Sequence, residues 1–169
     1  MLILPRVMKN FTAFIDGRGY IGRIESAKLP ELAINTEDFR GGGLDAPIEN
    51  DMGMNKLEGE IVLAEYNADA IKLWGLFNAN VPIVMRGAVQ RQGEQAATPV
   101  VIRMIGGFKT ISRDDWESGK NSKMTLAYSA TSYQEVIANE TVIDIDLLNS
   151  KRIIGGVDQL ESIRAALGE

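Results

Sequence analysis

Residues 81–91, VPIVMRGAVQR, and residues 98–112, TPVVIRMIGGFKTIS, decide the fold class. Both are typical of long strands, and the polar turn QGEQAA separates them. A third segment, residues 122–138, places Met124, Leu126 and Tyr128 on one side of a strand by alternation. Three long strands that follow one another through turns predict an antiparallel arrangement.

Shorter segments on either side continue this pattern. Residues 11–26, FTAFIDGRGYIGRIES, predict a strand, a tight turn at Asp16-Gly17 and a second strand, because Asp-Gly readily adopts the positive φ of a hairpin turn. Alternation predicts further strands over residues 31–39, residues 56–66 (with Leu57, Ile61 and Leu63 on one side) and residues 140–149.

Residues 67–78, NADAIKLWGLFN, predict one clear helix. Asn67 suits the N-cap, Asp69 suits the positive end of the helix dipole, and Asn78 suits the helix end. An apolar stripe recurs at helical spacing in Ala70, Leu73, Trp74 and Phe77. Such a stripe could line a ligand site, but packing against the core is the better interpretation.

The C-terminal residues 155–169, GGVDQLESIRAALGE, predict a second, short helix. Asp158 and Glu161 stand at the spacing of a capping box, and Gly168 supplies a stop. The predicted fold is therefore mainly β: an antiparallel β sandwich or partial barrel, with one packed helix and a short C-terminal helix.

Composition narrows the possible functions. The chain has 169 residues and no dividing linker, so we expect one domain over residues 1–169. It has no cysteine and no histidine, which excludes disulfides, thiolate nucleophiles and the commonest general base. The net charge is -5 and the basic residues are scattered, which argues against tight nucleic-acid binding. With no long apolar run and no signal-peptide pattern, we expect synthesis in a cytoplasm.

The glycine run in residues 40–47, RGGGLDAP, raises the question of a phosphate-binding loop. Such a loop needs its glycines between a strand and a helix N-terminus. Here no Gly-Lys-Ser/Thr or GxGxxG pattern occurs, Pro47 follows soon after, and the next segment is strand-like. The run is better interpreted as an unusually shaped connection.

Two carboxylate pairs on predicted strands raise the possibility of a metal site. Asp144 and Asp146, and likewise Glu58 and Glu60, could hold Mg²⁺ or Ca²⁺, but no further acidic ligand is identifiable, and half-buried strands alternate in the same way without function. The acidic turn around Trp116, residues 114–117, could serve a glycosidase only if two carboxylates faced each other across a cleft. A solvated turn with a tucked tryptophan is the better interpretation, so we predict no catalytic, cofactor-binding or metal site.

Several motifs along the chain occur in an order and spacing that point to one family. They are SAKLPELAINTEDFRGGGLDAP (residues 26–47) followed by DMGMNKLE (51–58), IDIDLLNSKRIIGGVDQLESIRAALG (143–168), FIDG (14–17) and DDW (114–116). They resemble the tail tube proteins of contractile-tailed bacteriophages and R-type bacteriocins. The resemblance spans essentially the whole chain, although Gly156 replaces the asparagine that is usual there.

The resemblance implies a structural, non-enzymatic role without a cofactor. Six subunits would form a ring, and rings would stack into a hollow tube inside a contractile sheath, in a virion tail or tail-like particle assembled in the host cytoplasm. The tube would pass DNA without specific binding in a phage, or pierce the target envelope in a bacteriocin. The partners would be further copies, the sheath, and baseplate, initiator and terminator proteins, with no membrane insertion of the monomer.

Two sets of residues follow as expected sites. We expect residues 39–55 to form a long loop that reaches the next subunit or ring. Phe39 and Leu44 would be its apolar anchors, and Arg40 and Asp45 would form ion pairs between subunits. The backbone of Gly41, Gly42 and Gly43 could lie close against the partner, since glycine has no side chain. We expect some of the acidic side chains to face the channel or another wetted surface, among Glu58, Glu60, Asp144 and Asp146. The alternatives are a type VI secretion tube and, from another class, a monomeric ligand-binding β-barrel.

Overall fold

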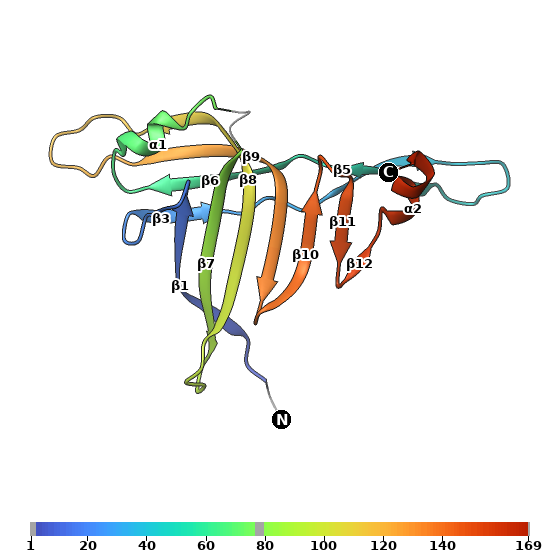
Figure 1. Ribbon diagram of the computed structural model, residues 1–169, viewed down its shortest axis with the longest axis horizontal. Coiled ribbons are helices and arrows are strands. Elements are labelled where there is room, and N and C mark those ends of the chain that lie inside the picture. The colour runs from blue at the N-terminus through green and yellow to red at the C-terminus, as the bar shows by residue number, and fades with distance from the viewer. Residues whose placement is uncertain (1–2, 77–79, 169) are drawn as a thin grey trace.

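The computed structural model describes residues 3–76 and 80–168. Those residues are mainly β, as predicted, and two short helices accompany the strands (Figure 1). The elements in chain order are β1 (Arg6–Ile15), β2 (Arg18–Gly19), β3 (Ile24–Lys28), β4 (Ile34–Phe39), β5 (Ile48–Met54), β6 (Leu57–Leu63), α1 (Ala68–Lys72), β7 (Val81–Arg91), β8 (Thr98–Arg113), β9 (Met124–Ile137), β10 (Glu140–Asp146), β11 (Lys151–Ile154), β12 (Val157–Asp158) and α2 (Glu161–Leu167).

One large antiparallel sheet contains the three long strands predicted from the sequence. β8 pairs with β7 on one side and with β9 on the other. The main path of the sheet runs β12-β11-β10-β9-β8-β7-β1-β2. The prediction of an antiparallel arrangement from residues 81–138 is therefore confirmed.

β9 belongs to two layers at once. β8 lies along its whole length, while on its other edge residues 124–130 pair with β6 and residues 132–137 pair with β10. The register shifts between Ile105 and Gly106, where the β8–β9 pair bends. In Figure 1, β3 and β6 run across β1 and β7, so the two layers form an open sandwich. The described strands do not close into a barrel.

The core lies between these layers and is apolar. The predicted alternation over β6 and the first half of β9 is confirmed, because Leu57, Ile61, Leu126 and Tyr128 are fully buried. The Tyr128 hydroxyl donates to the carbonyl oxygen of Lys28 at 3.1 Å, which links β9 to β3, and burial raises the pKa of this tyrosine.

The N-terminal hairpin is confirmed at its turn but not in its second strand. Asp16 and Gly17 both have positive φ, as the Asp-Gly turn requires. β2, however, pairs with β1 only over Arg18–Gly19, and β3 then pairs with β6 instead. The second predicted strand is thus divided between two layers, because pairing with β6 buries Ala27 against the core.

α1 is shorter than predicted. The Asn67 side chain caps it by accepting from the backbone N–H groups of Asp69 and Ala70, as expected. Beyond Lys72 the chain is captured by the edge of β8, where Trp74 forms an isolated bridge with Phe108 and donates its indole N–H to a backbone carbonyl. These sheet contacts end the helix. Phe77 and Asn78, predicted for the last turn, lie outside the described residues.

Candidate assembly surfaces

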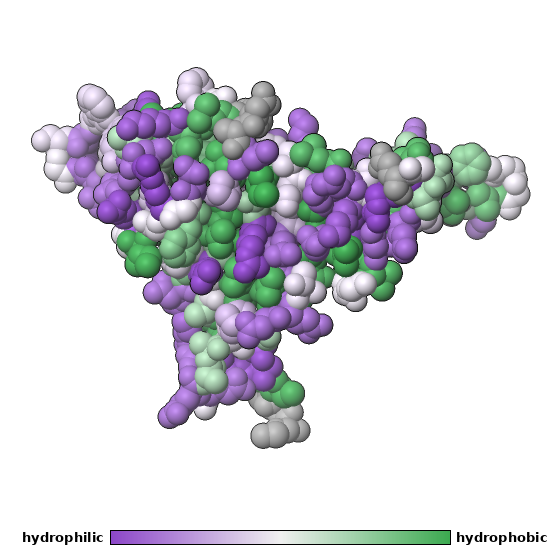
Figure 2. Space-filling view, viewed as in Figure 1, coloured by the Kyte–Doolittle hydropathy of each residue, from purple (hydrophilic) through white to green (hydrophobic). Residues whose placement is uncertain are grey.

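The hairpin of β4 and β5 is exposed along nearly its whole length, and we call residues 34–54 the arm. It forms a two-stranded sheet separate from the large one. Figure 2 shows the arm projecting from the body of the molecule, with hydrophobic side chains near its end. Phe39 is 53% exposed and Ile48 is 50% exposed, and the two residues pair across the hairpin. An apolar pair at the end of a projecting hairpin is suited to contact with another molecule.

The arm corrects the expectation of a long loop over residues 39–55. Only residues 40–47 connect the strands, because residues 48–54 form a strand that pairs with β4. Pairing satisfies backbone hydrogen-bonding groups that a free loop would leave to water. The expected contact residues Phe39 to Asp45 consequently gather at the tip of a hairpin.

The tip has a defined shape. Arg40 donates from its guanidinium to the Asp45 carbonyl oxygen at 3.2 Å, and so closes the turn within one chain. Gly43 has a φ of +88°, which favours glycine. A Cβ at Gly41 would lie 3.2 Å from the Phe39 ring, so the missing side chain lets that ring lie over the turn.

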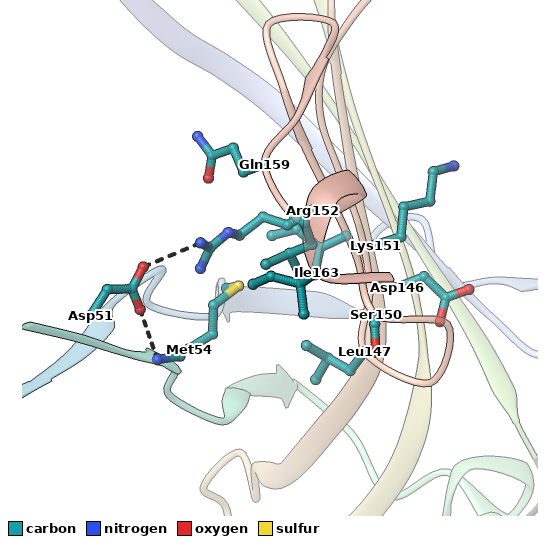
Figure 3. Close-up of a pocket in the computed structure, with 12 residues that line it drawn as sticks. Asp51, Met54, Asp146, Leu147, Ser150, Lys151, Arg152, Gln159 and Ile163 are labelled. Carbon is teal, nitrogen blue, oxygen red and sulfur yellow. Dashed lines mark hydrogen bonds and ion pairs between the residues drawn. The ribbon is translucent and has the colours of Figure 1, made fainter. Parts of the chain in front are cut away.

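Asp51 connects the arm to the C-terminal strands. Its carboxylate accepts from the Gly53 N–H at 2.7 Å and from the Arg152 guanidinium at 3.3 Å (Figure 3). Both donors hold the pKa of Asp51 below its ordinary value, and the Gly53 N–H has the larger effect. The Arg152 side chain is only 11% exposed. The pair borders a cavity of about 460 Å³ that Met54 and Ile163 also line, so one ion pair and a few apolar contacts hold the arm against the body.

Asp158 organises the C-terminal segment, but not as the predicted capping box. It pairs with Ile153 in the β11–β12 ladder, and its carboxylate accepts from Arg164 at 2.5 Å and from the Leu160 N–H at 3.0 Å. The hydrogen bond from Arg164 is the largest of the effects that lower the pKa of Asp158. α2 therefore begins only at Glu161, because Asp158 is part of a strand.

The predicted stop of α2 at Gly168 is confirmed. This residue has left-handed backbone geometry, with φ of 82°. Its N–H donates to the Ala165 carbonyl oxygen at 3.3 Å and so closes the last turn.

The acidic candidates Glu58 and Glu60 lie on β6 and point away from the core, since Leu57, Gly59 and Ile61 between and beside them are buried. Glu58 contacts the Lys109 ammonium at 2.5 Å, and this hydrogen bond lowers the pKa of Glu58. Glu58 and Glu60 thus lie on the outer face of the layer that contains β3 and β6.

The candidates Asp144 and Asp146 lie on β10, in the other layer. Asp144 contacts the Lys151 ammonium at 2.9 Å. Asp146 accepts from the backbone N–H groups of Leu148 and Asn149, and so shapes the turn after β10. The structure does not bring these two aspartates together with Glu58 and Glu60.

The acidic turn around Trp116 is solvated, but its tryptophan is not tucked in. Trp116 is 86% exposed, and its indole N–H donates to the Tyr66 hydroxyl at 2.6 Å. Over residues 3–76 and 80–168, no group of three or more acidic side chains could hold a metal ion. In the same part of the chain, no helix has the length and apolar character needed to cross a bilayer.

Sequence reasoning missed an apolar hollow of about 250 Å³ on the large sheet. It lies where β1, β7 and β8 extend beyond β3, and we call it the β1 hollow; its apolar lining is Met8, Phe11, Ala27, Leu29, Met85, Val100 and Ile102. Met8 and Phe11 reach the same side of β1 because a bulge lies between Met8 and Asn10. Alternation in the sequence carries no signal of that bulge.

Comparison with known proteins gives consistent matches along the chain. The family described as phage tail tube protein FII matches residues 5–168. The chain is 28% identical to the tail tube protein of Escherichia phage P2, over 99% of each chain. It is 26% identical to the major tail tube protein of Serratia phage KSP20, over 88% of this chain and 86% of that protein.

Among solved structures, the chain resembles the PVC sheath/tube terminator of an extracellular contractile injection system in its extended state, with a TM-score of 0.60. The match covers 80% of this chain and 99% of that chain at 8% identity, so it concerns the fold alone. Because the family match covers nearly every residue, this chain belongs to the phage tail tube protein FII family and is a structural tail tube protein, not an enzyme.

Proposed function

We propose that this chain, acting as one tail tube domain over residues 1–169, builds the inner tube of a contractile tail or tail-like particle. Six copies close a ring, and rings stack into a hollow tube. The observation that carries the proposal is the family match over residues 5–168, in a chain whose sheet is open and whose arm projects from the body.

The open sheet supports ring formation. At one end of the sheet, β2 covers only Phe14 and Ile15 of β1, so within the described chain residues 6–13 have a strand neighbour on one side only. At the other end lies the short strand β12. Exposed strand edges favour pairing with another chain. A cyclic ring pairs one edge of each copy with the other edge of its neighbour, and so leaves no edge free.

The fold also indicates which face of the large sheet would line the channel of the tube. One face of β7 to β10 packs into the core, so the opposite face would line the channel of the ring, with Asp144 and Asp146 on it. Register places Arg103 in one cross-strand row with Gln134 and Asp144. A face of mixed charge gives DNA no continuous basic track to bind, and an acidic excess repels it within a Debye length.

The outside of the tube would meet other proteins of the particle. The structural neighbour from the injection system is named a sheath/tube terminator. By analogy, this chain would contact a contractile sheath along its outer surface, a baseplate or initiator at one tube end and a terminator at the other. In a phage tail the tube conducts DNA, and in a headless particle it pierces the target envelope.

Negative-stain electron microscopy of the purified protein tests this proposal. The sample is imaged over a range of concentrations, alone and with baseplate seeds. We expect hollow rings or tubes with six-fold end views. Monomers that persist under both conditions would overturn the proposal, and a ring with another symmetry would overturn the six-membered arrangement.

A further inference from the structure

We propose that the tip of the arm of one copy docks into the β1 hollow of a second copy, with Phe39 and Ile48 in the hollow and Glu37 beside Arg6. This inference rests on the proposed tube function. It adds to that function the receiving surface and the residues that recognise the arm.

The β1 hollow is open and mainly apolar, and Arg86 and Gly87 complete its lining. Met8 is 49% exposed and Leu29 is 40% exposed at its rim, while Met85 and Ile102 at its base are buried. The absence of a side chain at Gly87 makes part of this space, since a Cβ there would lie 2.8 Å from the Met8 side chain. An apolar concavity on an otherwise mixed surface is suited to an apolar anchor from a partner.

The tip of the arm supplies such an anchor. Phe39 and Ile48 pair across the hairpin, and Leu44 and the Phe39 ring both lie near Gly41. All three apolar side chains are exposed in the single chain. The tip is also convex, since it ends a hairpin that projects beyond the body (Figure 2).

Charge supports the same pairing. The arm contains five carboxylates and one arginine: Glu37, Asp38, Asp45, Glu49 and Asp51 against Arg40. Beyond the hollow, Arg6 pairs in register with Arg91, two residues from Met8 on the same side of β1. Arg91 contacts Glu94, whereas Arg6 has no ion-pair partner among the described residues. An acidic arm and an unpaired arginine beside the hollow are complementary.

The spacing also matches. Glu37 precedes Phe39 by two residues on one face of β4, and Arg6 precedes Met8 by two residues on one face of β1. Each step spans about 6.6 Å along a strand. An arm that enters from the Arg6 end of the sheet would therefore place Glu37 at Arg6 when Phe39 reaches Met8.

The arm of the same chain does not reach this hollow. The Asp51–Arg152 contact fixes the arm beside β11, and four strands separate β11 from β1 in the sheet. At the usual strand spacing this separation is about 24 Å. In Figure 1 the arm also points away from β1. The contact is therefore between copies. Because donor and acceptor surfaces differ, each copy donates one arm and receives another, so the contact can be repeated from copy to copy through a stack.

Disulfide trapping tests the contact directly, because the chain has no cysteine of its own. Phe39→Cys protein and Met8→Cys protein are mixed, each as a minority, with unaltered chain, assembled, oxidised and separated without reductant. We expect a crosslinked heterodimer. Trp116→Cys replaces Phe39→Cys in the control mixture: Trp116 is more exposed than Phe39 and does not line the hollow, so this mixture should give no crosslink.

The outcomes separate the inference from the proposed function, because the same samples are imaged. Tubes without the Phe39–Met8 crosslink, or with an equal yield from the Trp116→Cys control, would overturn the docking and leave the tube function standing. Failure of the unaltered chain to form tubes, both alone and with baseplate seeds, would overturn the tube function itself.

A charge exchange tests the recognition separately. Arg6→Glu or Glu37→Arg alone should raise the critical concentration for assembly severalfold, since each places like charges together. The combination of both substitutions in one chain should restore it. If the double variant shows the sum of the two single effects on the critical concentration, the assigned Arg6–Glu37 pair is wrong. As a control, unchanged melting temperatures would confirm that each variant monomer is folded.

Discussion

The Asp51 carboxylate and the Arg152 guanidinium lie 101 residues apart in the chain and meet at 3.3 Å. Arg152 is almost enclosed by the C-terminal segment, whereas Asp51 belongs to an exposed hairpin. The contact therefore sets the direction of an arm that has little apolar packing of its own. A tube subunit benefits from such a contact, because an arm held in position loses less conformational entropy when it docks.

The first prediction concerns this contact. Asp51→Asn keeps the acceptor for the Gly53 N–H but removes the charge that faces Arg152. We expect faster amide hydrogen exchange in residues 48–54 and little change in the melting temperature, because Asp51 is half exposed and belongs to a hairpin outside the large sheet. Asp38→Asn, on the exposed part of the arm, is the matched control. Equal exchange in both variants would show that the ion pair does not hold the arm.

The second prediction concerns pH. The pKa of Asp158 is lowered by Arg164, so its folded-state value lies below its unfolded value. A lowered carboxyl pKa stabilises the folded state above the unfolded value of about 4, and this stabilisation is lost as pH falls through the folded value. Melting curves from pH 6 to pH 2 should therefore show a shallower decline in Asp158→Asn than in the unaltered chain. Parallel declines would contradict the assignment.

The third prediction compares two glycines. A side chain at Gly59 would collide with the Lys28 carbonyl oxygen and the Tyr128 hydroxyl, whereas a Cβ at Gly42 would meet nothing within 4 Å. Gly59→Ala should lower the free energy of unfolding by about 1–3 kcal/mol, the usual effect of overpacking. Gly42→Ala should leave it almost unchanged. Denaturant unfolding of the two monomers measures the difference, and equal stabilities would refute it.

Local patterns in the sequence predicted much of the fold. The three long strands, the alternation of Leu57 and Ile61, the Asn67 cap and the Gly168 stop depend on neighbours within a few residues, and each is confirmed. Where the prediction was wrong, a distant partner decides the structure. β8 ends α1 early, and the β11–β12 ladder takes Asp158 out of its expected cap.

The assembly surfaces were harder to predict for the same reason. Composition pointed to the glycine-rich tip, but only the pairing of β4 with β5 shows that residues 48–54 are a strand rather than a loop. The β1 hollow depends on the bulge after Met8 and on the point at which β3 ends, at Lys28. Neither feature has a signature in the order of residues, because both arise from three-dimensional register.

The last prediction concerns Gly42 in the assembled tube. Since a Cβ at this position has open space in the single chain, Gly42→Val should fold normally. In a tube, a branched side chain at the tip would keep the arm from lying closely against its neighbour, so we expect no tube growth. Circular dichroism and electron microscopy of the same sample measure both properties. Asn121→Val, in an exposed turn away from the arm, is the control that should still form tubes. Normal tubes from Gly42→Val would show that the tip of the arm does not take part in assembly.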